Sequence, residues 1–234
     1  MDIEKILNIK KKGKNFYLDI KTQGWNRELG KMKDDNVLLH SNKIKKNREI
    51  YKVYHLSDLK EFKEVCKKSG INCDVTIMNG GILNEKNFTG EMFPTYGHIH
   101  TAPRNEIYKV IRGRAFLVLV DEDAKKETII DMKKGDEFMI NFKYPHRIYT
   151  FNSAVILGFV PNDAGHDYDA IKNMGFPYHL FYDQKNKDII FKKNKKFGNF
   201  DIALGNPQNI DSENLFFTNI EKITSLLFGD FKNL

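Results

Sequence analysis

Short apolar or alternating segments, each followed by turn residues, fill the middle of this 234-residue sequence. Seven of them lie between Asp74 and Pro161 and recur at intervals of about ten residues. Pairs such as Gly80-Gly81 and Lys134-Gly135 separate them, as turns separate antiparallel strands. We predict strands at 75–78, 107–111, 115–120, 128–130, 137–140, 147–151 and 154–160. Consecutive strands without intervening helices predict an all-β sandwich or barrel.

The flanking regions carry weaker signals. Residues 17–20 and 37–39 have strand-like patterns. From Ser57 to Gly70 the apolar residues share one helical face, with Ser57 suited to cap the first turn and Gly70 to end the helix. Thr218-Asn219-Ile220-Glu221 has the form of a capping box and predicts a short terminal helix.

The length of the chain favours one domain with extensions. We expect an N-terminal extension at residues 1–50 that packs on the barrel and a barrel domain at 51–182. A C-terminal extension rich in lysine and asparagine should follow at 183–234 and contain the terminal helix.

Composition limits the environments in which the chain can work. Aromatic residues make up 12% of it, whereas Gly and Pro contribute only 16 and 6 residues, which is typical of a folded protein. No segment approaches the ~18–20 consecutive apolar residues that span a bilayer, and the first residues lack a secretory signal. We therefore expect a cytoplasmic protein without a membrane partner, in which Cys66 and Cys73 stay reduced.

The net charge of +7 favours an anionic partner. The basic residues are scattered, and they form no zinc finger, RNA-binding aromatic motif or helix-turn-helix. We therefore predict no nucleic-acid partner, and a small phosphorylated metabolite would be drawn to the same field.

The histidines contain the clearest chemical signal. His98 and His100 are two residues apart, so on a strand both imidazoles point to the same side and can reach one metal ion. A carboxylate at Glu106 could return to that side after a turn at Pro103. His40, His55 and His179 have no such neighbours, and we expect structural or exposed positions for them.

The spacing of Gly97-His98-Ile99-His100, Glu106, Gly113, Gly135 and Pro145-His146 resembles the two motifs of the cupin superfamily. The resemblance implies a jelly-roll barrel, also called a double-stranded β-helix, with a few peripheral helices. It also implies a divalent metal ion held by His98, His100, Glu106 and His146. Three nitrogens and one oxygen suit Fe(II), our first choice, as well as Mn(II), Zn(II) or Ni(II). Glu91 is open between orienting a ligand histidine and forming a buried salt bridge.

Longer segments are similar to the cupin-type phosphoglucose isomerases known chiefly from archaea. They are Thr89–His100, Glu106–Gly113 and Pro161–Tyr168, within a region of resemblance from about residue 20 to about residue 180. This family interconverts glucose 6-phosphate and fructose 6-phosphate, usually as a homodimer. The resemblance therefore implies a sugar-phosphate substrate and a homodimeric partner.

The same resemblance assigns residues to the substrate. Thr76, Thr95 and Gly97 match positions that hold the phosphate, and short hydroxyls with a glycine do let donors approach phosphate oxygens. Tyr51 and Tyr108 match tyrosines that contact sugar or phosphate. His166 and Tyr168 belong to the active site or to a structural latch at the barrel mouth; both interpretations stay open.

Isomerisation requires a proton to move between C1 and C2 through an enediol. A divalent ion stabilises the developing charge, and a carboxylate can shuttle the proton. Glu106 is the candidate base as well as a candidate ligand, although a carboxylate fully engaged by metal is a poor base. A swinging Glu106, another proton carrier and a hydride shift are the alternatives.

Three departures from the family pattern leave other functions open. The segment between His100 and Glu106 is one residue shorter, Val160 replaces a pocket tyrosine, and Thr150 replaces an asparagine. The alternatives are another cupin enzyme, such as an Fe(II) dioxygenase or an isomerase of a different sugar phosphate, and a non-catalytic cupin that binds sugar phosphates.

Overall fold

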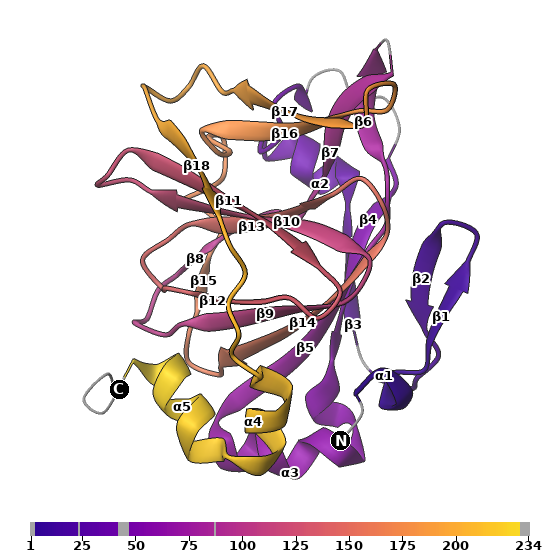
Figure 1. Cartoon of the computed structure of the whole chain (residues 1–234), viewed down its shortest axis with the longest axis vertical. Coiled ribbons are helices and arrows are strands. Elements are labelled where there is room, and N and C mark those ends of the chain that lie inside the picture. The colour runs from indigo at the N-terminus through magenta and orange to yellow at the C-terminus, as the bar shows by residue number, and fades with distance from the viewer. Residues whose placement is uncertain (1–2, 23, 42–46, 87, 230–234) are drawn as a thin grey trace.

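Two curled β-sheets packed face to face form the body of the protein (Figure 1). The computed structural model describes residues 3–22, 24–41, 47–86 and 88–229. The first sheet has the order β12-β9-β14-β5-β4-β3, and its strands are Glu137–Ile140, Glu106–Arg112, Ala154–Pro161, Ile71–Met78, Glu49–His55 and Gly24–Glu28.

The second sheet has the order β17-β16-β7-β13-β10-β11-β18, with β6 paired to β7. Its strands are Asp188–Lys193, Tyr178–Asp183, Thr89–Pro94, His146–Thr150, Arg114–Asp121, Lys126–Lys133, Asp201–Gly205 and, for β6, Ile82–Lys86. Two small pairs complete the strands: β1 (Ile9–Lys12) with β2 (Asn15–Leu18), and β8 (Ile99–His100) with β15 (His166–Asp167). The prediction of an all-β, jelly-roll-like barrel with a few peripheral helices is confirmed.

The helices are short and lie outside the barrel. They are α1 (Ile3–Ile6), α2 (Leu29–Asp34), the 3₁₀ turn η2 (Leu56–Asp58), α3 (Lys60–Ser69), α4 (Ser212–Thr218) and α5 (Ile220–Phe228). In Figure 1, α3, α4 and α5 gather below the first sheet. None of the described helices is long and apolar enough to cross a membrane.

The central strand β14 separates two apolar cores, because successive side chains of a strand point to opposite faces. Ile156 faces the interior between the two sheets, where it joins Val110 of β9. Leu157 and Phe159 face the outer core and pack with residues of α3, α4 and α5. Burial of each such side chain contributes about 1.5–3 kcal/mol to the free energy of unfolding. Strand β14 therefore holds the first sheet against both the second sheet and the outer helices.

All seven predicted strands are present as β5, β9, β10, β11, β12, β13 and β14. The helix before Gly70 is confirmed as well, but Ser57 does not cap it, because Leu59 occupies the N-cap of α3. The terminal helix α5 is capped by Asn219, whose side chain accepts a hydrogen bond from the backbone of Lys222. The capping box from Thr218 to Glu221 therefore begins one residue too early.

The strand predicted at residues 37–39 is wrong. This buried segment forms turns, and the carbonyl of Val37 accepts hydrogen bonds from the guanidinium of Arg147. Its apolar residues reflect burial rather than strand pairing. The division of the chain at residues 50 and 182 stays a prediction.

Candidate metal centre

Four side chains meet at one end of the barrel: His98, His100, Glu106 and His146. Their ligand atoms all lie within 4.8 Å of one another. The Nε2 atoms of His146, His100 and His98 lie 3.1, 3.3 and 3.6 Å from Oε2 of Glu106. The structure thus brings together the four predicted ligands, and this group can hold a metal ion.

The local backbone explains why the four side chains converge. His98 and His146 form a β-bridge in which each backbone N–H donates to the carbonyl of the other, at 3.1 and 2.9 Å. Gly97 precedes this bridge with a φ of +89°, a conformation that favours glycine. A Cβ there would lie 2.8 Å from the ring of Phe176 and 3.1 Å from the carbonyl oxygen of His146. Only glycine fits without displacing the segment that carries His98.

Hydrogen bonds on the far side of two rings select the tautomer. Nδ1 of His146 donates to the carbonyl of Tyr144 at 3.0 Å, and Nδ1 of His100 donates to the carbonyl of Arg104. Each bond leaves the Nε2 lone pair directed at Glu106, as metal-ligating histidines require. Nε2 of His98 and of His100 are buried without a hydrogen-bond partner among the described residues. Buried nitrogens without partners are suited to bind a cation.

The charge state of the cluster also suits a cation. Burial lowers the pKa of His98 to about 3, and His146 adds to this effect, so His98 is neutral. Burial would raise the pKa of Glu106, but its contacts with the imidazoles of His100, His146 and His98 hold it well below its usual range. Glu106 in turn raises the pKa of His100 against the effect of burial, so a proton competes with a metal ion for this nitrogen.

The C-terminal helix holds the residue just before Glu106. The backbone N–H of Asn105 donates to the carbonyl of Leu227 at 2.8 Å, and its amide donates to the carbonyl of Leu226 at 2.9 Å. The amide oxygen of Asn105 accepts from the backbone of Phe142 at 3.2 Å. Helix α5 therefore belongs to the support of the metal centre.

A cavity of about 100 Å³ borders His98 and Glu106 on the interior face of the first sheet. The seven residues expected to contact the substrate all line it: Tyr51, Thr76, Thr95, Gly97, Tyr108, His166 and Tyr168. Val160 lines it too and gives this part of the wall an apolar surface. The centroid of the His166 ring lies 4.4 Å from that of the His98 ring. Two residues before His166, the carbonyl of Ala164 accepts a hydrogen bond from the backbone N–H of Thr101.

Strand β3, at the edge of the first sheet, contributes residues that the sequence reasoning did not assign. Trp25 lines the cavity, and Arg27 lies two residues further on β3, on the same face. The guanidinium of Arg27 lies 5.2 Å from the rings of Trp25 and Tyr96 and 5.8 Å from that of Tyr168. Its Nε is buried without a partner in the described part of the chain. The alternation of Trp25 and Arg27 is the only part of this arrangement that the sequence carries; their pairing opposite Val53 and Tyr51 is a matter of strand register.

The positive charge of Arg27 affects the groups at one end of the cavity. Burial raises the pKa of Tyr51, while the adjacent guanidinium of Arg27 acts in the opposite direction. The hydroxyl of Tyr51 also accepts a hydrogen bond from the backbone of Tyr96 at 3.4 Å. This end of the cavity is therefore rich in donors and positively charged.

A second buried polar group lies in the barrel away from the metal centre. Glu91 forms a 2.6 Å salt bridge with His179, which decides its open role: it does not contact a ligand histidine. Glu127 is fully buried, and one of its oxygens accepts from the backbone of Tyr178 at 2.9 Å. The other oxygen has no partner within the residues described, and burial raises the pKa of Glu127 to about 8.

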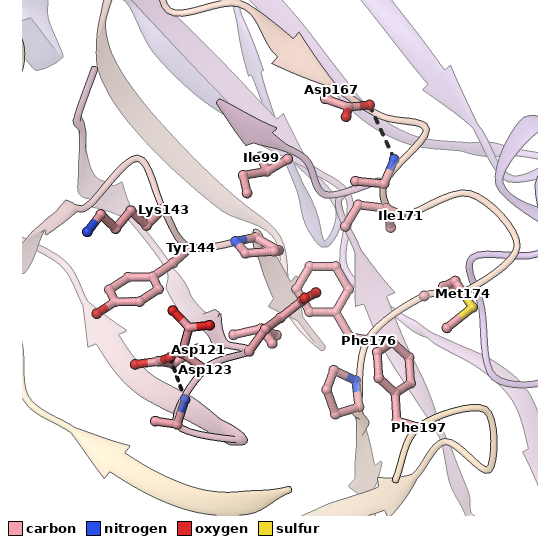
Figure 2. A pocket seen from close by; sticks show the side chains of 17 residues that line it. Ile99, Asp121, Asp123, Lys143, Tyr144, Asp167, Ile171, Met174, Phe176 and Phe197 are labelled. Atoms are coloured by element: carbon pink, nitrogen blue, oxygen red, sulfur yellow. Dashed lines mark hydrogen bonds between the residues drawn. The ribbon is translucent and has the colours of Figure 1, made fainter. Parts of the chain in front are cut away.

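A larger cavity of about 740 Å³ is lined by Ile99, Tyr144 and Phe176, among others (Figure 2). Ile99 lines this cavity, whereas its neighbours His98 and His100 turn to the metal centre. Two of its four acidic side chains, Asp121 and Asp167, accept hydrogen bonds from the backbone N–H groups of Ala124 and Ala170. Size alone therefore does not identify the functional site.

Comparisons with solved structures find partial likeness to cupin proteins. An oxalate oxidase is 16% identical with a TM-score of 0.36 and covers 50% of this chain and 53% of its own. Oxalate decarboxylase from Bacillus subtilis is 19% identical with a TM-score of 0.33 and covers 50% of this chain and 25% of its own. At such low scores the fold rests on the strand order of the chain itself.

Sequence comparisons are more specific. A glucose-6-phosphate isomerase of Thermococcus kodakarensis is 32% identical over 136 residues, which are 57% of this chain and 66% of that protein. A glucose-6-phosphate isomerase of Thermococcus litoralis is 26% identical over 153 residues, or 63% and 72% of the two chains. The chain thus matches just under two thirds of the length of the first of these relatives. The profile of the family described as Glucose-6-phosphate isomerase (GPI) matches residues 28–197, and the chain belongs to this family.

Proposed function

We propose that the protein is a metal-dependent isomerase that interconverts glucose 6-phosphate and fructose 6-phosphate through an enediol. The observation that carries the proposal is the cluster of three histidines and Glu106 at the edge of a cavity with a donor-rich end. Membership of the isomerase family supports the choice of substrate. Fe(II) is the proposed cofactor, with Mn(II), Zn(II) and Ni(II) as alternatives, and the bound ion would stabilise negative charge on the substrate oxygens.

The two ends of the cavity give the substrate a direction. Thr76, Thr95 and the backbone of Gly97 would hold the phosphate, near the guanidinium of Arg27. The enclosed volume of about 100 Å³ is smaller than the ~300–1,000 Å³ of ordinary ligand sites. The phosphate would therefore reach toward the rim at Trp25, which is 37% exposed.

Glu106 can serve as base as well as ligand, because its two oxygens face different groups. All three histidine contacts are made by Oε2. Oε1 lies 3.5 Å from the place a Cβ would occupy on Gly158, which lines the cavity. Oε1 would take the proton from C2 and return it to C1, while Oε2 stays with the metal. Tyr108, beside Glu106, would contact the sugar chain.

The decisive experiment combines elemental analysis with a coupled assay that converts fructose 6-phosphate to glucose 6-phosphate, with and without added Fe(II) or Mn(II). We expect turnover that depends on the metal. His146→Ala should lose most bound metal and all activity yet keep its circular dichroism spectrum, whereas His40→Ala should keep both metal and activity. Binding of fructose 6-phosphate without turnover would instead favour a sensor, and oxygen uptake would favour a dioxygenase.

The homodimer and the cytoplasmic location stay predictions. The same holds for the expectation that neither a nucleic acid nor a membrane is a partner. Light scattering of the purified protein would test the homodimer.

A further inference from the structure

One row of residues crosses four strands of the first sheet and passes under the cavity. His55 on β4 pairs with Asp74 on β5, Asp74 pairs with Gly158 on β14, and Gly158 pairs with Tyr108 on β9. Directly opposed residues point to the same face of a sheet, and Asp74, Gly158 and Tyr108 all line the cavity. Because Gly158 has no side chain, space opens between the carboxylate of Asp74 and the phenol of Tyr108.

The position of this row along the strands places it in the middle of the site. Glu106 lies two residues before Tyr108 on β9, and Thr76 lies two residues after Asp74 on β5. These strands run in the same direction, because both are antiparallel to β14. The row therefore lies between the metal centre and the threonine proposed to hold phosphate.

The carboxylate of Asp74 is held in place by one hydrogen bond and can accept others. Its Oδ1 lies 2.9 Å from Nδ1 of His55, and this hydrogen bond raises the pKa of His55. Its side chain is 25% exposed, and Oδ2 has no hydrogen bond to any described residue. The other carboxylate of the cavity, Glu106, already faces three imidazoles.

Asp74 is the carboxylate among the side chains around the middle of the cavity. Val53, Ile156 and Val160 line the cavity with apolar side chains close to Asp74 in the sheet. A carboxylate oxygen facing such a cavity suits hydroxyl donors, since hydrogen bonds to a charged acceptor are stronger than those between neutral groups. The same charge repels a phosphate, which would be held instead at the end near Arg27.

We propose that Asp74, fixed by His55, binds hydroxyl groups on the middle carbons of an open-chain sugar phosphate and so determines which sugar is accepted and in which direction it lies. The proposal rests on the proposed function for the identity of the ligand. It adds a specificity-determining residue, Asp74, and a positioning residue, His55, to the wall between the metal centre and Thr76.

The test compares two ligands that differ in hydroxyl groups. Glucitol 6-phosphate, an open-chain polyol phosphate, and inorganic phosphate are titrated calorimetrically into the full chain as purified. Asp74→Ala should weaken glucitol 6-phosphate about 10- to 100-fold and leave inorganic phosphate within about twofold. Asp74→Asn, which keeps the shape and one neutral acceptor, should show a smaller loss, and His55→Ala should weaken the polyol phosphate through Asp74.

The control is Asp131→Ala. Asp131 lies on β11, outside the cavity, and its carboxylate pairs with Arg114 on β10. This substitution should change neither affinity. Equal weakening of both ligands by Asp74→Ala, or no weakening of the polyol phosphate, would overturn the proposal. Failure of the proposed function looks different: the wild type would then bind the two ligands with the expected dependence on Asp74 but would not turn over fructose 6-phosphate.

Discussion

Glu127→Gln should change how the stability of the fold depends on pH. The Glu127 side chain is fully buried on β11, and burial raises its pKa from the usual 4.5 to about 8. Between these two values the folded chain keeps a proton that the unfolded chain has released. The contribution of protonated Glu127 to the free energy of unfolding is therefore fully present below about pH 4.5 and is lost as the pH rises through about 8.

The magnitude follows from the size of the shift. Each unit of difference between the folded and unfolded pKa values corresponds to about 1.4 kcal/mol. From about pH 5.5 to about pH 8, Glu127 should lower the free energy of unfolding by about 3 kcal/mol. Glutamine cannot ionise, and its oxygen can still accept from the backbone of Tyr178.

Urea unfolding, followed by circular dichroism in the presence of a chelator at several pH values, measures this difference. The variant should approach or exceed the wild type at the alkaline end, so that the two curves converge or cross. Glu122→Gln, an exposed change on the same hairpin, serves as the control. Parallel stability curves for wild type and Glu127→Gln would show that Glu127 is not held neutral in the folded protein.

Two further predictions concern the cavity and the metal centre. Arg27→Ala should raise KM for fructose 6-phosphate about 10- to 100-fold with little change in kcat, and Arg27→Lys should restore part of the loss, because a point charge replaces the guanidinium fork. Steady-state kinetics test this. Arg48→Ala is the control, because the guanidinium of Arg48 lies over the ring of Phe93. An unchanged KM in Arg27→Ala would exclude Arg27 from phosphate binding. Gly97→Ala should cost about 1–3 kcal/mol in stability and lower metal content, since its Cβ would meet Phe176; full metal occupancy with wild-type stability would contradict the geometry.

The sequence predicted the parts of the fold whose pattern is local. Strands such as β10 and β14 are continuous apolar runs buried on both faces, and both were found at the predicted places. Strands β16, β17 and β18 were missed. Their outer positions are only partly buried, as in β18, where Leu204 is 77% exposed, so their sequences carry little apolar periodicity. Their pairing depends on neighbours far along the chain, including the parallel contact of β18 with β11.

Two of the predicted metal ligands, His98 and His100, follow from local spacing, because residues two apart on a strand face the same side. His146 was added by the resemblance to the cupin motifs. Arg27 and Asp74 were not assigned because each gains its role from cross-strand partners. Asp74 acquires meaning only when His55 and Gly158 are placed on either side of it. Residues defined by their position in a sheet row are invisible until the register of the strands is known.

Helix α5 lies beyond the segment that matches the isomerase family, which ends at residue 197, yet it holds Asn105 through the carbonyls of Leu226 and Leu227. The anchor of the carboxylate ligand thus comes from a part of the chain that the family profile does not describe. Substitutions in this C-terminal helix would therefore reach the candidate metal centre through Asn105 without changing any of its four side chains. A shortened version that stops before residue 226 would keep all four ligands but lose the clasp on Asn105.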